Sequence, residues 1–189
     1  MLAGTERGAL LAVVADLTEA VKVLREDTHP ELFAVVNRQL ALAYLMMPMG
    51  ADGDRIRLGV AVTSLRAALR VFTPQTHPVE WASTQLNLAN ALQYLPSVHQ
   101  ADNLDEAVQL YEEVLQHRDE DRDPLGVARV LTNQGNALGH LGAIEDAEER
   151  LGQARELFAE AGDAEGVAAV DELLAEVAEA GARQAGTAR

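Results

Sequence analysis

Histidine and carboxylate side chains are the residues of this chain that can act as acid–base catalysts or bind a metal. The chain has five histidines, 30 acidic residues and no cysteine. His29 and His77 each precede a proline, while His99 lies near a turn and His117 near a helix end. Only His140 lacks such a structural explanation, and neither a second histidine nor a carboxylate four residues away accompanies it. Since a metal or catalytic site needs several such groups together, the sequence predicts neither kind.

The carboxylates follow helical spacing instead of a catalytic pattern. Examples are two stretches, Asp105, Glu106, Glu112 and Glu113, and then Glu145, Asp146, Glu148 and Glu149. Charges placed in this way are typical of the solvated face of a helix. The sequence has no glycine-rich phosphate loop and no nucleophile elbow. We therefore expect a protein that is not an enzyme and that needs no cofactor.

The formal net charge of −15 narrows the classes of partner. A non-specific nucleic-acid binder needs a positive face that displaces counterions from phosphates, so we expect no nucleic-acid partner. An anionic membrane would repel the chain, and its apolar runs at 8–15 and 40–49 are too short to cross a bilayer. The absence of cysteine suits a cytoplasmic protein.

The chain repeats itself. Residues 11–34 align with 59–82 at an offset of 48, which places Thr28-His29-Pro30 on Thr76-His77-Pro78. An offset of 46 places Asn90-Ala91-Leu92 on Asn136-Ala137-Leu138, and an offset of 40 places residues 126–128 on 166–168. A recurring period of this length predicts an array of similar structural units.

Each unit has apolar residues three and four positions apart, which predicts two amphipathic helices joined by a turn. Pro30, Pro78 and Pro124 suit the first positions of helices, and Asp123 suits the cap of the third. The expected helices are 6–26, then the pairs 30–47 with 55–72, 79–95 with 103–118 and 124–141 with 144–160, and finally 164–180.

These helices divide the chain into segments. We expect a capping helix in 1–27, repeats in 28–73, 74–120 and 121–162, a second capping helix in 163–181 and a disordered tail in 182–189.

Small and large residues within the units resemble the tetratricopeptide repeat. The third unit has Gly135, Leu138, Ala147 and Leu151 at the spacing of that family, and residues 81–92 resemble a variety found in bacterial proteins. The usual tryptophan is replaced by Asn37, Gln85 and Leu131. The resemblance implies an all-α, right-handed superhelical solenoid of antiparallel helix hairpins with about eight helices. HEAT-type repeats, which have a similar period, are the alternative.

Extended concave surfaces are what such solenoids use for binding, and the first helix of each pair forms the concave wall. The polar residues expected on this wall are Arg38, Gln39, Asn87, Asn90, Gln93, Arg129, Asn133, Asn136 and His140. The resemblance implies that such asparagines hold the main chain of an extended peptide. Leu42 and Asn133 stand where a carboxylate clamp has other residues, so that type of clamp is not predicted. The asparagines can instead bond between neighbouring helices and set their stacking.

The predicted function is therefore a non-enzymatic scaffold or adaptor that binds a protein or peptide in its groove. One alternative is a scaffold that associates with itself into a homo-oligomer. The other is a small-ligand sensor or an accessory subunit of a bacterial signalling or biosynthetic system.

Overall fold

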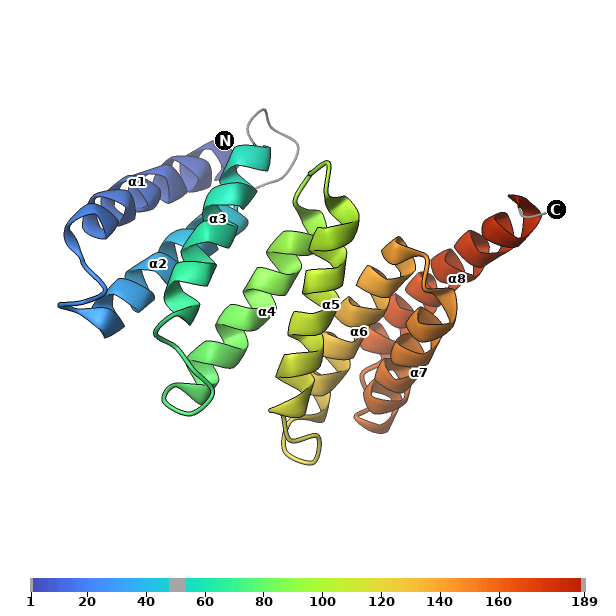
Figure 1. Cartoon of the computed structure of the whole chain (residues 1–189). Coiled ribbons are helices and arrows are strands. Elements are labelled where there is room, and N and C mark those ends of the chain that lie inside the picture. The colour runs from blue at the N-terminus through green and yellow to red at the C-terminus, as the bar shows by residue number, and fades with distance from the viewer. Residues whose placement is uncertain (1, 48–53, 188–189) are drawn as a thin grey trace. The chain divides into compact units, whose positions relative to one another are not determined.

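The computed structural model describes residues 2–47 and 54–187, over which the chain forms eight helices and no strand (Figure 1). It divides into two compact units, which we call unit 1 (residues 1–98) and unit 2 (residues 99–189). The helices of unit 1 are α1 (Leu2–Val23), α2 (Pro30–Leu45), α3 (Asp54–Leu69) and α4 (Pro78–Tyr94). The helices of unit 2 are α5 (Gln100–Gln116), α6 (Pro124–Leu141), α7 (Ile144–Glu160) and α8 (Ala164–Thr187).

Within each unit, every helix packs against the next one along the chain. Alternate helices also touch, since α2 contacts α4 in unit 1 and α6 contacts α8 in unit 2. Both units therefore consist of stacked helix hairpins, which confirms the predicted all-α class and the succession of hairpins (Figure 1).

The observed helix bounds agree with the predicted bounds, apart from differences of a few residues at the ends of helices. Helices α6 and α7 have the predicted bounds 124–141 and 144–160. Helix α8 is longer than predicted, because the segment from 182 to Thr187 is helical where a disordered tail was expected. Residues 188–189 of that tail, and the turn at 48–53 inside the first predicted repeat, lie outside the described residues. The second predicted repeat, 74–120, spans the division between the two units.

Three helices begin with the same backbone turn before a proline. His29, His77 and Asp123 have φ values of −141°, −141° and −140°, and a proline follows each of them as the first helical residue. The Asp123 side chain also accepts a hydrogen bond from the backbone N–H of Gly126 at 3.0 Å, which confirms the predicted cap. The shared backbone conformation at the start of these three helices explains why the prolines recur in the sequence.

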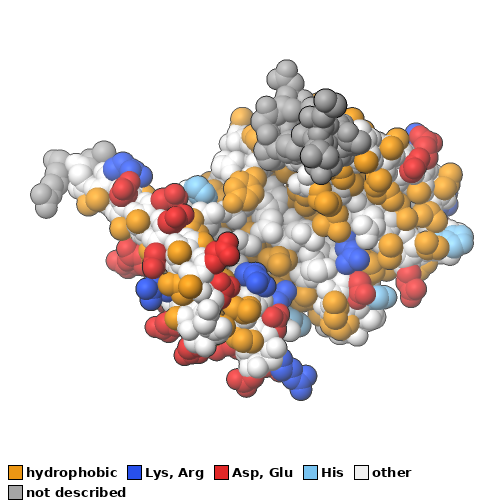
Figure 2. All heavy atoms as spheres, turned by 180° about the vertical axis from the view of Figure 1, so that it is seen from behind, with side chains coloured by type: hydrophobic (Ala, Val, Ile, Leu, Met, Phe, Trp, Pro, Cys, Tyr) orange, Lys and Arg blue, Asp and Glu red, His pale blue; other side chains and the backbone are white. Residues whose placement is uncertain are grey.

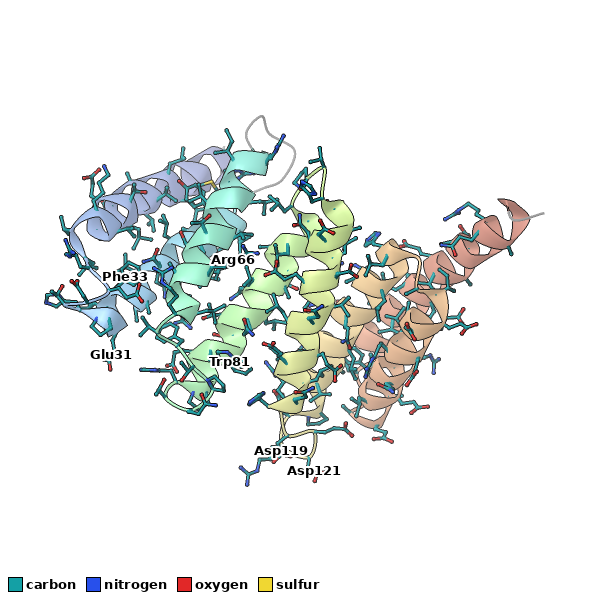
Figure 3. The ribbon with its side chains drawn as sticks, viewed as in Figure 1. Glu31, Phe33, Arg66, Trp81, Asp119 and Asp121 are labelled. Atoms are coloured by element: carbon teal, nitrogen blue, oxygen red, sulfur yellow. The ribbon has the colours of Figure 1, made fainter. Side chains whose placement is uncertain are left out.

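The core of unit 1 includes Trp81, which lies in the first turn of α4 (Figure 3). It packs in one cluster with Ala34 of α2, Ala68 of α3 and Phe72, which follows α3. Trp81 is only 7% exposed, so it is a core residue of unit 1.

The three residues that replace the tryptophan of the repeat pattern are buried as well. Asn37, Gln85 and Leu131 are each about 95% buried. Asn37 donates a hydrogen bond from Nδ2 to the carbonyl oxygen of Phe33 at 2.8 Å, so its amide stays paired inside the unit. This repeat position is therefore a core position whether its residue is polar or apolar.

Unit 2 is held by close contacts of small residues. A Cβ atom on Gly135 of α6 would lie 2.7 Å from Cγ of Leu151 on α7 and 3.2 Å from the carbonyl oxygen of Ala147. Only a residue without a side chain fits there.

An ion pair joins α7 to α8. Nε of Arg155 on α7 donates to Oδ1 of Asp171 on α8 at 2.6 Å, and this bond raises the pKa of Arg155.

The Gly135 contact makes a stability prediction. Gly135→Val should lower the free energy of unfolding by about 1–3 kcal/mol, because the added atoms overpack the α6–α7 crossing. Gly152→Val is the matched control, since a Cβ on Gly152 of α7 meets nothing within 4 Å. Its effect should stay within about 0.5 kcal/mol. Urea unfolding followed by circular dichroism measures both, and equal effects of the two variants would contradict the close α6–α7 packing.

Candidate functional site

The polar residues predicted on α6 lie on the side of that helix that faces α8. Arg129 and Asn133 line a hollow of about 110 Å³ together with Phe158 and Val170. One and two turns further along α6, Asn136 and His140 line a second hollow of about 150 Å³. Helix α8 contributes Leu173, Glu176, Val177 and Arg183 to the second hollow. The structure therefore brings four of the nine predicted residues together on one surface, which we call the α6–α8 face.

Three of these four side chains are unpaired. Arg129, Asn136 and His140 make no hydrogen bond or ion pair with any residue in the described part of the chain, and Arg129 and His140 are exposed. Asn133 is already engaged in an interaction within the protein. The alternative role of the asparagines, bonding within the stack, is thus consistent with Asn133 and not with Asn136.

The charges around the α6–α8 face differ from one end to the other. Arg129 lies at one end, while Glu176 and Arg183 line the hollow with His140 at the other. Unit 2 as a whole is strongly acidic, since it contains 21 of the 30 acidic residues and seven of the 15 basic residues. Its net charge of −14 is nearly all of the total, and acidic side chains predominate over its surface in Figure 2 (left).

Unit 1 presents fewer of the predicted residues at its surface. Gln39 on α2 is exposed and Asn87 on α4 is half-buried, and neither makes a hydrogen bond with the described residues. Asn90 is already engaged within the protein. Gln93 is only 4% exposed, because it lies on the packing side of α4. Gln93 therefore offers little surface to a ligand in unit 1.

Arg38 has a structural role within unit 1 that the sequence did not predict. Its Nη1 donates to Oγ of Ser83 on α4 at 3.1 Å, and its guanidinium lies 5.9 Å from the centre of the Phe72 ring. The side chain therefore joins α2 to α4 and to the residues that follow α3. It is committed to packing and is not available as a groove residue.

The role of Arg38 gives a second stability prediction. Arg38→Ala should lower the free energy of unfolding by about 1–2 kcal/mol, since it removes the bond to Ser83, the contact with the Phe72 ring and the packing of its aliphatic stem. Gln39→Ala, at the exposed neighbouring position, should change it by less than about 0.5 kcal/mol. Urea titration of both variants is the measurement. Arg38→Ala as stable as Gln39→Ala would show that the interhelical contact contributes nothing.

Sequence reasoning missed Gln134, which lies on the opposite side of α6. Gln134 is buried and lines a separate hollow with residues of α5 and α7. The repeat alignment contains a signal for it, since offsets of 46 and 48 place Gln134 on Leu88 and Leu40. A polar residue at a position that is otherwise leucine is unusual in a core.

Within the described residues, no group of three or more His, Asp or Glu side chains is placed to hold a metal ion. No helix in the described ranges has both the length and the apolar character needed to cross a membrane. No family model matches the chain, and no curated protein is significantly similar to it.

Proposed function

We propose that this chain is a non-enzymatic binding scaffold of the tetratricopeptide type, and that unit 2 holds an extended peptide on the α6–α8 face. The observation that carries the proposal is the row of unpaired polar side chains Arg129, Asn136 and His140 along hollowed surface. An amide both donates and accepts hydrogen bonds, so Asn136 suits the N–H and C=O groups of a peptide backbone.

The dimensions of the face suit a short segment. Arg129 and His140 are eleven residues apart on α6, which is about 16 Å at a rise of 1.5 Å per residue. An extended peptide advances about 3.3 Å per residue, so about five of its residues span this distance. Apolar side chains of the peptide can enter the two hollows, where Phe158, Val170 and Val177 provide apolar surface.

The charges indicate the composition of the peptide. Arg129 attracts an acceptor at one end, while Glu176 and Arg183 at the other end can each pair with a residue of opposite charge. The net charge of unit 2 favours a basic partner and speeds its approach at low ionic strength. A cytoplasmic bacterial protein is the setting we propose for this interaction.

The test begins with peptides selected from a random display library on the wild-type protein. Their dissociation constants for Arg129→Ala/Asn136→Ala should rise at least about tenfold, because a charged and a neutral hydrogen bond are both lost. Calorimetry or fluorescence anisotropy measures the constants.

The matched control is Arg122→Ala/Gln116→Ala, which likewise removes one arginine and one side-chain amide, from exposed positions away from the face. It should bind the selected peptides as the wild type does. If both double variants bind these peptides equally well, the peptide site lies elsewhere and the proposal fails.

A further inference from the structure

Unit 2 has a third hollow, of about 530 Å³, on the side formed by α5, α6 and α7, and it is larger than the two on the α6–α8 face. A volume of this size is within the range of small-ligand sites. Its charged lining consists of four carboxylates and one guanidinium, from Glu112, Glu113, Asp146, Glu149 and Arg150. Apolar surface is added by Val108 of α5 and Leu138 of α6. The hollow is therefore acidic at its edges and partly apolar.

Gln134 of α6 lines this hollow and is only 2% exposed. Its Nε2 donates to the carbonyl oxygen of Val108 at 3.3 Å and to Oε2 of Glu112 at 3.2 Å. Both partners are acceptors, which fixes the orientation of the amide. Its Oε1 is buried and has no hydrogen-bond donor among the described residues. A buried carbonyl oxygen without a donor costs free energy, so this atom is expected to have a partner.

The fold does not need a polar residue at this position. The aligned residues of the other repeats, Leu40 and Leu88, are buried leucines. Replacing a core leucine by glutamine buries an amide and brings no gain in packing. The amide of Gln134 is therefore better explained by a ligand than by stability.

Glu112 links the amide to the charged edge of the hollow. Its Oε2 accepts from Gln134 and also from Nη2 of Arg150 at 3.2 Å, while its Oε1 makes no bond with the described residues. Arg150 thus shares a carboxylate oxygen with the buried amide and stands beside it.

We propose that this hollow binds the ammonium group of an alkylamine. An ammonium group has three donors and no acceptor, so it can bind the Gln134 oxygen and two carboxylates at once. The alkyl chain then lies on Val108 and Leu138. The site uses the side of α6 opposite the α6–α8 face, and it is independent of peptide binding there. The amine belongs either to a free diamine or to a lysine side chain of a partner.

The test is a titration of the ¹⁵N-labelled full chain at low salt with cadaverine, n-pentylamine and the neutral analogue n-pentanol. Both amines should shift the side-chain amide resonance of Gln134 saturably, and pentanol should not. Gln134→Leu should weaken amine binding at least about tenfold, since it removes a hydrogen bond to a charged group. This variant is expected to fold, because leucine occupies the aligned positions.

A second pair of variants tests the charge at Glu112 independently. Glu112→Gln should weaken binding of the amines by a similar factor. Glu148→Gln removes the same charge from an exposed position of α7 outside the hollow, and it should change binding less than about twofold. Arg150→Met should tighten binding, because it removes the competing guanidinium.

Two results would overturn the proposal. One is amine binding of unchanged strength in both Gln134→Leu and Glu112→Gln. The binding would then be a diffuse attraction of the amine to an acidic surface. The other is the absence of saturable binding of either amine. A further titration with Nα-acetyl-lysine amide identifies the source. If it binds more tightly than cadaverine, the ligand is a lysine side chain, and the reverse order assigns a free diamine.

Discussion

Small side chains where helices cross are the constraint on which the rest of the structure depends. In unit 1, Ala41, Ala61 and Ala68 have no exposed surface, and in unit 2 Gly135 of α6 lies directly against Leu151 of α7. Helices approach to about 8–10 Å only when the residues between them allow it. Close approach determines which side of each helix is inside, and it thereby fixes the polar residues that remain outside. A larger residue at Gly135 would separate α6 from α7 and move both surfaces of α6.

Helix α6 contributes residues to both proposed sites because it lies between other helices of unit 2. One of its sides carries Asn136 and its polar neighbours toward α8, and another carries Gln134 toward α5 and α7. The two amides differ in their surroundings. Asn136 is half-buried and unpaired in a shallow hollow, which suits a peptide backbone, whereas Gln134 is buried beside carboxylates, which suits a cation. A single rigid helix can thus position ligand groups on two surfaces without a loop.

The arrangement of helices could be predicted because the local signals repeat. Prolines mark three helix starts, and self-comparison of the chain was enough to find them. Gly135, at a close helix crossing, stood out through the resemblance to the tetratricopeptide pattern. Individual side chains were harder to place. Arg38 reaches Ser83, 45 residues away, and no local pattern contains that contact. Gln93 is buried on the packing side of α4, and its polar residue type gave no signal of that burial. The part of α8 beyond residue 181 contains no proline that would end the helix, and it is rich in alanine.

The central claim is that a peptide lies along the α6–α8 face, and nuclear magnetic resonance mapping of a bound peptide tests it most directly. With a selected peptide added to the ¹⁵N-labelled chain, the account predicts the largest shifts at Arg129, Asn136 and His140 of α6 and at Glu176 of α8. Resonances of the outward residues of α5 and α7 should stay in place. Shifts confined to α5 and α7, or to α1, would contradict the account, because they would place the peptide on a surface other than the one these polar residues form.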